Sequence, residues 1–215
     1  MKSDSSLRPY RQTARAEAAA ETADRILSAF MARMERFWFD EIRMEDVAKD
    51  AGVTVQTIIR RFGGKDGLLA AGQALMERDI MNARQVPRGD WARAIDAIVA
   101  EYEMLGGQMI RLLAQEHRHA PIKATTDLGR AQHREWVGTV FAPRLDAMPA
   151  QERRHAHDKL VIALDVYVWK LIRIDMQRSL TELRRTMIEL CAAALGISPD
   201  ALSADLTHSG EAFDA

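Results

Sequence analysis

The segment 53–65 has the residue types of a polyanion-binding surface. No carboxylate occurs in it, and its three cations are Arg60, Arg61 and Lys65. The chain as a whole has 30 Lys and Arg against 31 Asp and Glu, so positive charge is concentrated locally. Cations gathered in this way would pair with phosphates of a nucleic acid. Gln56 and Thr57 precede them and could form hydrogen bonds with base edges.

The elements that would position these residues are two short helices joined by a tight turn. Apolar residues recur at helical intervals over 44–51. Gly52 can take the positive φ that a sharp turn needs, and Thr54 can cap a second helix over 55–62. This pattern predicts a helix-turn-helix, whose second helix enters the DNA major groove. An ordinary hairpin in a helical bundle is the alternative, and the local charge favours DNA binding.

Residue type assigns a role to each side chain of this motif. Base edges are assigned to Val55, Gln56 and Thr57, with Val55 against a thymine methyl group. Phosphates are assigned to Arg43, Thr54, Arg60, Arg61 and Lys65. Arg60 could instead read a guanine, because an arginine fork can bond both acceptors of that base.

Helical periodicity runs through nearly all of the 215 residues, which predicts an all-α protein with about nine helices. The expected helices are 18–37, 44–51, 55–62, 65–83, 91–105, 108–117, 126–141, 151–176 and 180–195. Asp90, Thr126 and the capping box Ser179–Glu182 would begin three of them. Gly106-Gly107 is expected to interrupt one helix, and Pro121 lies in an expected break.

Turn residues and charge divide the chain into four parts. Residues 1–20 are expected to form a basic flexible arm, which either reaches the DNA or is a solvated tail. Residues 21–86 would form the helix-turn-helix domain with its connecting helix. Residues 87–196 would form a ligand-binding and dimerisation bundle, beginning at Pro87-Arg88-Gly89. Residues 197–215 are expected to be a disordered tail.

The segment 160–174 is apolar on nearly every side, and such a helix must be covered on every side. The last helix carries an apolar stripe of its own. We therefore expect a homodimer through the last two helices, about 151–176 and 180–195. Full burial within one chain is the alternative.

This organisation resembles the tetracycline-repressor (TetR) family of bacterial transcriptional regulators. The matching residues lie between Arg25 and Leu69 and include Asp46-Val47-Ala48, Ala51-Gly52-Val53-Thr54, Thr57, Phe62 and Lys65. The resemblance implies a repressor that a small molecule releases from a palindromic operator. Trp38, Arg43 and Ile59 depart from the family pattern, where Gly, Thr and Tyr are usual. Arg43 could still reach a phosphate as a charge, whereas Ile59 loses a hydrogen bond.

Aromatic and methionine side chains of the middle helices are candidates for a ligand pocket, with core packing as the alternative role. The candidates are Tyr102, Met109, Trp136, Tyr167 and Trp169. They favour a hydrophobic effector. Asp165 lies in the most apolar helix and needs a partner, which could be Lys170 or Arg173, a ligand, or a second chain.

Other functional classes have little support in the residues. The single Cys191 excludes an internal disulfide and fits a cytoplasmic protein. The pairs His117/His119 and His155/His157 have a spacing that points their members in opposite directions on a helix, so we expect no metal. The sequence also has no glycine-rich phosphate loop, no nucleophile-elbow pattern and no evident base for Cys191, so we expect no cofactor and no catalytic residues. We also expect no membrane segment. A helical enzyme and a helical protein-interaction module with a basic patch remain the alternatives.

Overall fold

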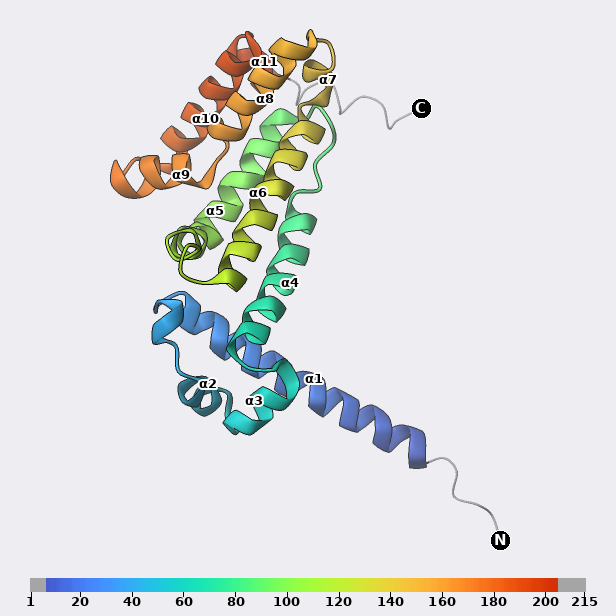
Figure 1. Cartoon of the computed structure of the whole chain (residues 1–215). Helices are drawn as coiled ribbons and strands as arrows, with labels where there is room; N and C mark the ends of the chain where they lie inside the picture. Colours follow the sequence, from blue (N-terminus) through green and yellow to red (C-terminus); the bar gives the residue numbers. More distant parts are fainter. Residues whose placement is uncertain (1–6, 205–215) are drawn as a thin grey trace. The chain divides into compact units, whose positions relative to one another are not determined.

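The computed structural model describes residues 7–204 and confirms an all-α fold (Figure 1). This part of the chain holds eleven α-helices, one 3-10 turn and one π-helical segment, so the expected number of about nine helices is too low. None of these helices combines the length and apolar content that crossing a bilayer requires.

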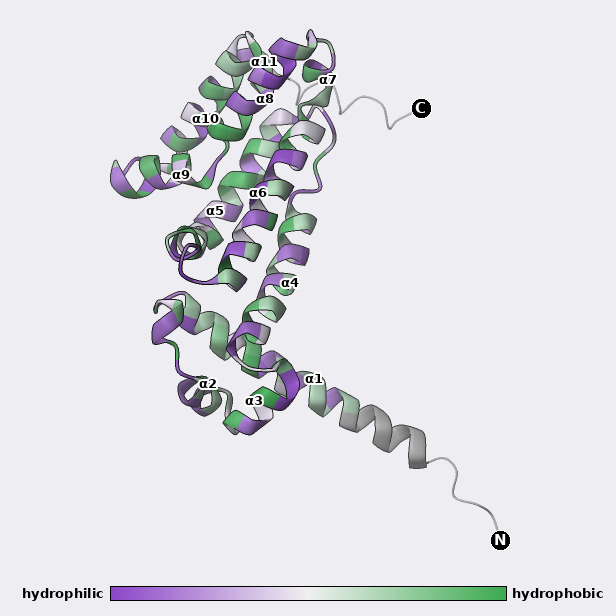
Figure 2. Cartoon of the chain, in the orientation of Figure 1, coloured by the Kyte–Doolittle hydropathy of each residue, from purple (hydrophilic) through white to green (hydrophobic). Residues whose placement is uncertain are grey.

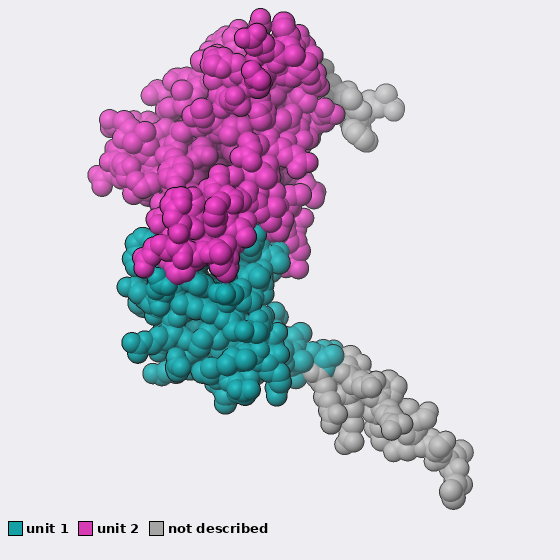
Figure 3. Space-filling model, in the orientation of Figure 1, with its two compact units in different colours: residues 1–75 teal, residues 76–215 magenta. Residues whose placement is uncertain are grey.

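The chain divides into two compact units, residues 1–75 and 76–215 (Figure 3). The first begins with α1 (Leu7–Met34) and the 3-10 turn η1 (Phe39–Glu41), followed by α2 (Met44–Ala51), α3 (Val55–Phe62) and α4 (Lys65–Ala83). The division therefore falls inside α4, before the boundary expected at Pro87.

The predicted flexible arm, residues 1–20, is helical from Leu7 onwards in the structure. It belongs to α1, which is longer than the expected 18–37 at its N-terminal end and ends at Met34. Residues 1–6 lie outside the described part of the chain.

Apolar side chains from each helix meet in the core of the first unit. Those that are buried are Ile26, Phe30 and Met34 of α1, Phe39 of η1, Ile42 between η1 and α2, Val47, Ala48 and Ala51 of α2, Ile58 of α3, and Leu68 and Leu69 of α4. They recur at three- and four-residue intervals along α1 and α2, so each helix is held by one apolar face.

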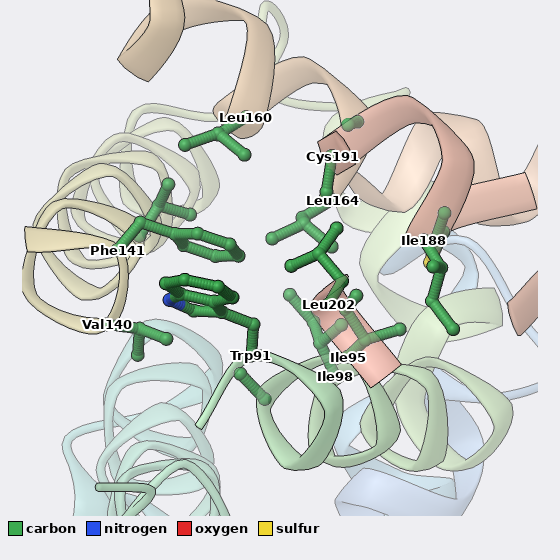
Figure 4. Packing of buried hydrophobic residues seen from close by; sticks show 14 of the residues in the cluster. Trp91, Ile95, Ile98, Val140, Phe141, Leu160, Leu164, Ile188, Cys191 and Leu202 are labelled. Atoms are coloured by element: carbon green, nitrogen blue, oxygen red, sulfur yellow. The ribbon is translucent and has the colours of Figure 1, made fainter. Parts of the chain in front are cut away.

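The second unit is a helical bundle. Its elements are α5 (Trp91–Leu113), α6 (Ala120–Val140), α7 (Ala142–Leu145), α8 (Ala150–Ala163), α9 (Val166–Trp169), the π-helical segment Lys170–Asp175, α10 (Leu180–Leu195) and α11 (Pro199–Ala204). Helices α5, α6, α8 and α10 pack on one another. Figure 4 shows Trp91 and Phe141 stacked in this core, with ring centroids 6.1 Å apart.

The glycines at 106 and 107 do not interrupt α5, so the helix break that the sequence predicts there is wrong. The helix is continuous from Trp91 to Leu113. A Cβ on Gly106 would lie 2.6 Å from a ring carbon of Trp169. Gly106 is therefore a point of close approach between α5 and α9 and not a break.

The helix expected at 126–141 begins earlier, at Ala120, with His119 as its N-cap. Pro121 lies in the first turn, where its missing N–H costs no hydrogen bond. Thr126 is buried within the helix and caps no helix end, and its hydroxyl donates to the Glu116 carboxylate at 2.5 Å.

The helix expected at 151–176 is three elements, because it ends at Ala163 and restarts at Val166. Asp165 has extended backbone and accepts the N–H of Tyr167 at 2.8 Å as the N-cap of α9. The expected partners of Asp165 are engaged elsewhere, since Lys170 pairs with Asp175 and Arg173 with Glu103. Aspartate favours caps over helix interiors, because its short side chain can accept a hydrogen bond from a nearby backbone N–H.

The expected disordered tail at 197–215 contains ordered structure. Helix α11 occupies Pro199–Ala204, and its Leu202 is completely buried in the core of the second unit. Residues 205–215 lie outside the described part of the chain.

Candidate nucleic-acid interface

The turn between α2 and α3 has the geometry that the sequence predicts. Gly52 ends α2 with φ +65° and ψ 39°, in the left-handed region. The N–H of Val53 donates to the carbonyl of Ala48 at 2.9 Å. Thr54 then caps α3, since its hydroxyl oxygen accepts the N–H of Thr57 at 3.2 Å. These local hydrogen bonds fix the start of α3.

Contacts with α1 hold α2 in place. Ala48 and Ala51 are buried, and their small side chains let a neighbouring helix approach closely. The guanidinium of Arg33 contacts the carboxylates of Asp46, at 3.4 Å, and Asp50, at 2.7 Å. The sequence analysis did not identify this cluster, although the i,i+4 spacing of the two aspartates places them on one face of α2.

Helix α3 is anchored by one side chain and presents polar groups elsewhere. Ile58 is fully buried, whereas Gln56 and Arg60 are exposed and Val55 and Thr57 are half-buried. The hydroxyls of Thr57 and Thr54 lie 3.0 Å apart, so part of the hydrogen-bonding capacity of Thr57 is used within the cap.

The cations assigned to phosphates fall into two groups. Arg43, at the N-cap position of α2, and Arg60 are exposed. Arg61, although exposed, donates to the carbonyl of Ala19 in α1 at 2.6 Å. The ammonium of Lys65 lies 4.4 Å from the ring centroid of Phe39. Partial burial lowers the pKa of Lys65, and the negative charges of Asp40 and Asp66 offset part of this decrease.

Trp38 replaces the glycine usual in the family without backbone strain. Its φ of −66° and ψ of 151° are extended values that any residue adopts. Its N–H donates to the Glu41 carboxylate at 2.9 Å, which stabilises the start of η1. Ile59 is 45% exposed on α3, so it leaves an apolar side chain near the cations.

The structure brings together only some of the residues predicted for a ligand pocket. Tyr102 is buried and donates to the carbonyl of Leu164 at 2.9 Å, and its ring lies 6.3 Å from that of Trp169. Trp136 contacts a different residue, Arg84.

The other two predicted pocket residues differ from each other in burial. Met109 packs against the core of the second unit, and Tyr167 is 56% exposed. Four of the five residues therefore belong to the core cluster or pack against it, whereas Tyr167 is exposed, and a ligand pocket stays a prediction.

Part of the first unit is similar to a known protein family. Residues 34–71, which contain the two helices and their turn, match the family model of bacterial regulatory proteins of the tetR family. This segment is therefore similar to the N-terminal segment of tetR-family regulatory proteins. The match supports transcription regulation through DNA binding.

Two solved structures share the fold of this chain over most of its length. One is assigned as a TetR-family transcriptional regulator from Rhodococcus sp., with a TM-score of 0.61 and 15% identity, covering 81% of this chain and 99% of that chain. The other is assigned as a transcriptional regulator from Pseudomonas aeruginosa PAO1, with a TM-score of 0.63 and 16% identity, covering 84% and 93%. At these identities the likeness concerns the fold. A comparison with curated proteins finds no match.

Proposed function

We propose that this protein is a non-enzymatic, sequence-specific transcriptional repressor that binds a palindromic operator as a homodimer in the cytoplasm. The observation that carries the proposal is the surface of α3. Its buried Ile58 anchors a helix whose Gln56 and Arg60 are exposed, within a domain of a DNA-binding family. A two-fold dimer would present two such helices about one turn of DNA apart, roughly 34–36 Å.

The DNA contacts divide into those that read sequence and those that hold the backbone. Val55, Gln56 and Thr57 would contact base edges. Arg43, Thr54, Arg60, Arg61 and Lys65 would contact phosphates. Arg61 and Lys65 already have partners within the first unit, so they would share these partners with a phosphate or exchange them for it.

The homodimer would form through 151–176 and 180–195. Large apolar side chains are exposed there, with Ile162, Leu171, Ile174, Met176 and Leu190 between 42% and 65% accessible. Figure 2 shows hydrophobic residues along α9 and α10. A groove of about 420 Å³ in this region is lined by Val168, Leu171, Ile172, Met176 and Leu190 together with polar residues of α10. An apolar surface of this kind favours a protein partner, and a second copy satisfies both chains at once.

A small hydrophobic effector would release the repressor from its operator. Support comes from the aromatic side chains inside the bundle, where Tyr102 and Trp169 lie together and Trp136 is half-buried. Such a molecule can shift the protein only by binding one conformation more tightly than the other.

Disruption of the apolar surface tests the proposal. Ile162→Glu with Leu190→Glu should convert the dimer to a monomer in light scattering and should abolish tight binding to a palindrome. The control is Leu128→Glu, because Leu128 of α6 is also exposed but lies outside the proposed interface. A monomeric wild-type protein, or a double variant that still dimerises, would contradict this interface. Equal affinity for all duplexes would instead favour an interaction module with a basic patch.

A further inference from the structure

Arg84 forms a buried ion pair at the end of α4. Its N–H donates to the carbonyl of Ile80 at 2.9 Å and closes the last turn of that helix. Its guanidinium makes two hydrogen bonds with the Glu101 carboxylate of α5, Nε–Oε2 at 2.6 Å and Nη2–Oε1 at 2.7 Å. Only 9% of the Arg84 side chain and 2% of the Glu101 side chain are exposed.

A second helix, α6, holds the same residue. The indole N–H of Trp136 donates to the carbonyl of Arg84 at 3.0 Å, and the guanidinium lies 5.0 Å from the Trp136 ring centroid. One turn earlier in α6, the Gln132 amide donates to the Glu77 carboxylate of α4. The C-terminal part of α4 is thus bonded to both α5 and α6, and all of these residues belong to the second unit.

Stability alone is a poor explanation for this arrangement. Desolvation of two charges offsets much of their attraction, and apolar residues of similar volume are often as stable in such a place. A bidentate arginine–carboxylate pair is nevertheless strict in its geometry. Together with the Trp136 N–H bond, the Arg84–Glu101 pair fixes both the direction of the end of α4 and its rotation about the helix axis relative to α5 and α6.

We propose that Arg84 is a positioning residue for DNA binding, which fixes the direction in which α4 leaves the second unit and thereby selects the half-site spacing of the operator. Helix α4 is the covalent link between the two units, because residues 65–75 belong to the first and 76–83 to the second. The inference rests on the proposed dimer, since spacing matters only when two recognition helices bind together.

The test measures affinity for a series of palindromes that differ only in spacer length. Spacers longer than the selected one by about two and about five base pairs rotate the second half-site by up to half a turn of DNA. The variant is Arg84→Met with Glu101→Leu, which removes both charges and leaves no buried charge unpaired. We expect the preference for the selected spacer to fall by about tenfold, the loss of one good base contact. Affinity for a single half-site should stay within about twofold, because no DNA-contacting residue changes.

Two further proteins separate positioning from general stability. The matched control is Arg130→Met with Glu116→Leu, which removes a partly buried ion pair between α6 and the segment after α5, in the same unit and outside the proposed dimer interface. This control should keep the full spacing preference. Trp136→Phe keeps an aromatic ring but removes the N–H bond to the Arg84 carbonyl. It should therefore relax the preference partly, and it keeps the test available if the double variant does not fold.

The outcomes separate this inference from the proposed function. A spacing preference that survives in both Arg84 and Trp136 variants overturns the positioning role. A preference lost equally in the Arg130 control also overturns it, because the effect would then follow from destabilisation. Absence of any spacing preference in the wild-type protein overturns the palindromic dimer itself, and the positioning role with it.

Discussion

Gly106 and Gly107 are neighbours in α5, yet alanine should have opposite effects at the two positions. Gly107 is exposed, and a Cβ there would meet no atom within 4 Å. At Gly106 the Cβ would lie 2.6 Å from Cζ3 of Trp169 and 2.8 Å from two other ring carbons. The Trp169 ring cannot yield easily, because it is buried and its N–H donates to Glu103 at 2.7 Å.

The magnitudes follow from helix propensity and overpacking. Gly107→Ala should raise the free energy of unfolding by about 0.5–1 kcal/mol, since alanine loses less backbone entropy in a helix. Gly106→Ala gains the same amount, but overpacking costs about 1–3 kcal/mol. The anchored ring places this cost in the upper part of that range. We expect a net loss of about 1–2 kcal/mol for Gly106→Ala.

Urea unfolding followed by circular dichroism measures both variants against the wild-type protein. The expected result is a higher midpoint for Gly107→Ala and a lower one for Gly106→Ala, with unchanged slopes. Stabilisation by both substitutions would show that Trp169 does not pack on Gly106. Destabilisation by both would show that α5 is broken at this point, as the sequence pattern alone indicates.

Three other predictions concern the DNA surface and the bundle. Gln56→Ala and Thr57→Ala should each weaken binding to the selected operator by about 1–3 kcal/mol while affinity for a scrambled duplex stays unchanged in fluorescence anisotropy; equal loss on both duplexes would contradict base reading. Lys65→Ala should weaken binding to every duplex and flatten the log–log salt dependence by about 1.8 for a dimer, so an unchanged slope would reject a phosphate contact. Burial, with Arg84 nearby, lowers the pKa of His133 from 6.5 to about 4, so between these pH values the unfolded chain binds a proton that the folded chain does not. As the pH is lowered from 6.5 to 4, the free energy of unfolding should therefore decrease by up to about 3 kcal/mol more in the wild-type protein than in His133→Phe. Parallel urea-unfolding profiles for the two proteins would refute this.

Local patterns in the sequence predict the helix-turn-helix well, because its geometry depends on neighbouring residues. Gly52 supplies the left-handed turn and Thr54 the cap, each within a few residues of its partner. The capping box of Ser179 and Glu182 is confirmed for the same reason, since both reciprocal hydrogen bonds are present.

The features that sequence analysis missed depend on residues far apart along the chain. Gly106 is explained only by Trp169, which α9 places against it. Arg61 looks like a free cation in the sequence, but it bonds the carbonyl of Ala19, 42 residues earlier. The charged pair of Arg84 with Glu101 has no local signature either, since each residue alone resembles a solvated surface charge.

Selection of bound fragments from genomic DNA by the purified protein at physiological salt tests the central claim most directly. A sequence-specific dimeric regulator should enrich one palindrome, with half-sites about one helical turn apart. Salt-sensitive binding to all fragments without enrichment would contradict the account, because the cations of α3 would then act only as a generic basic surface.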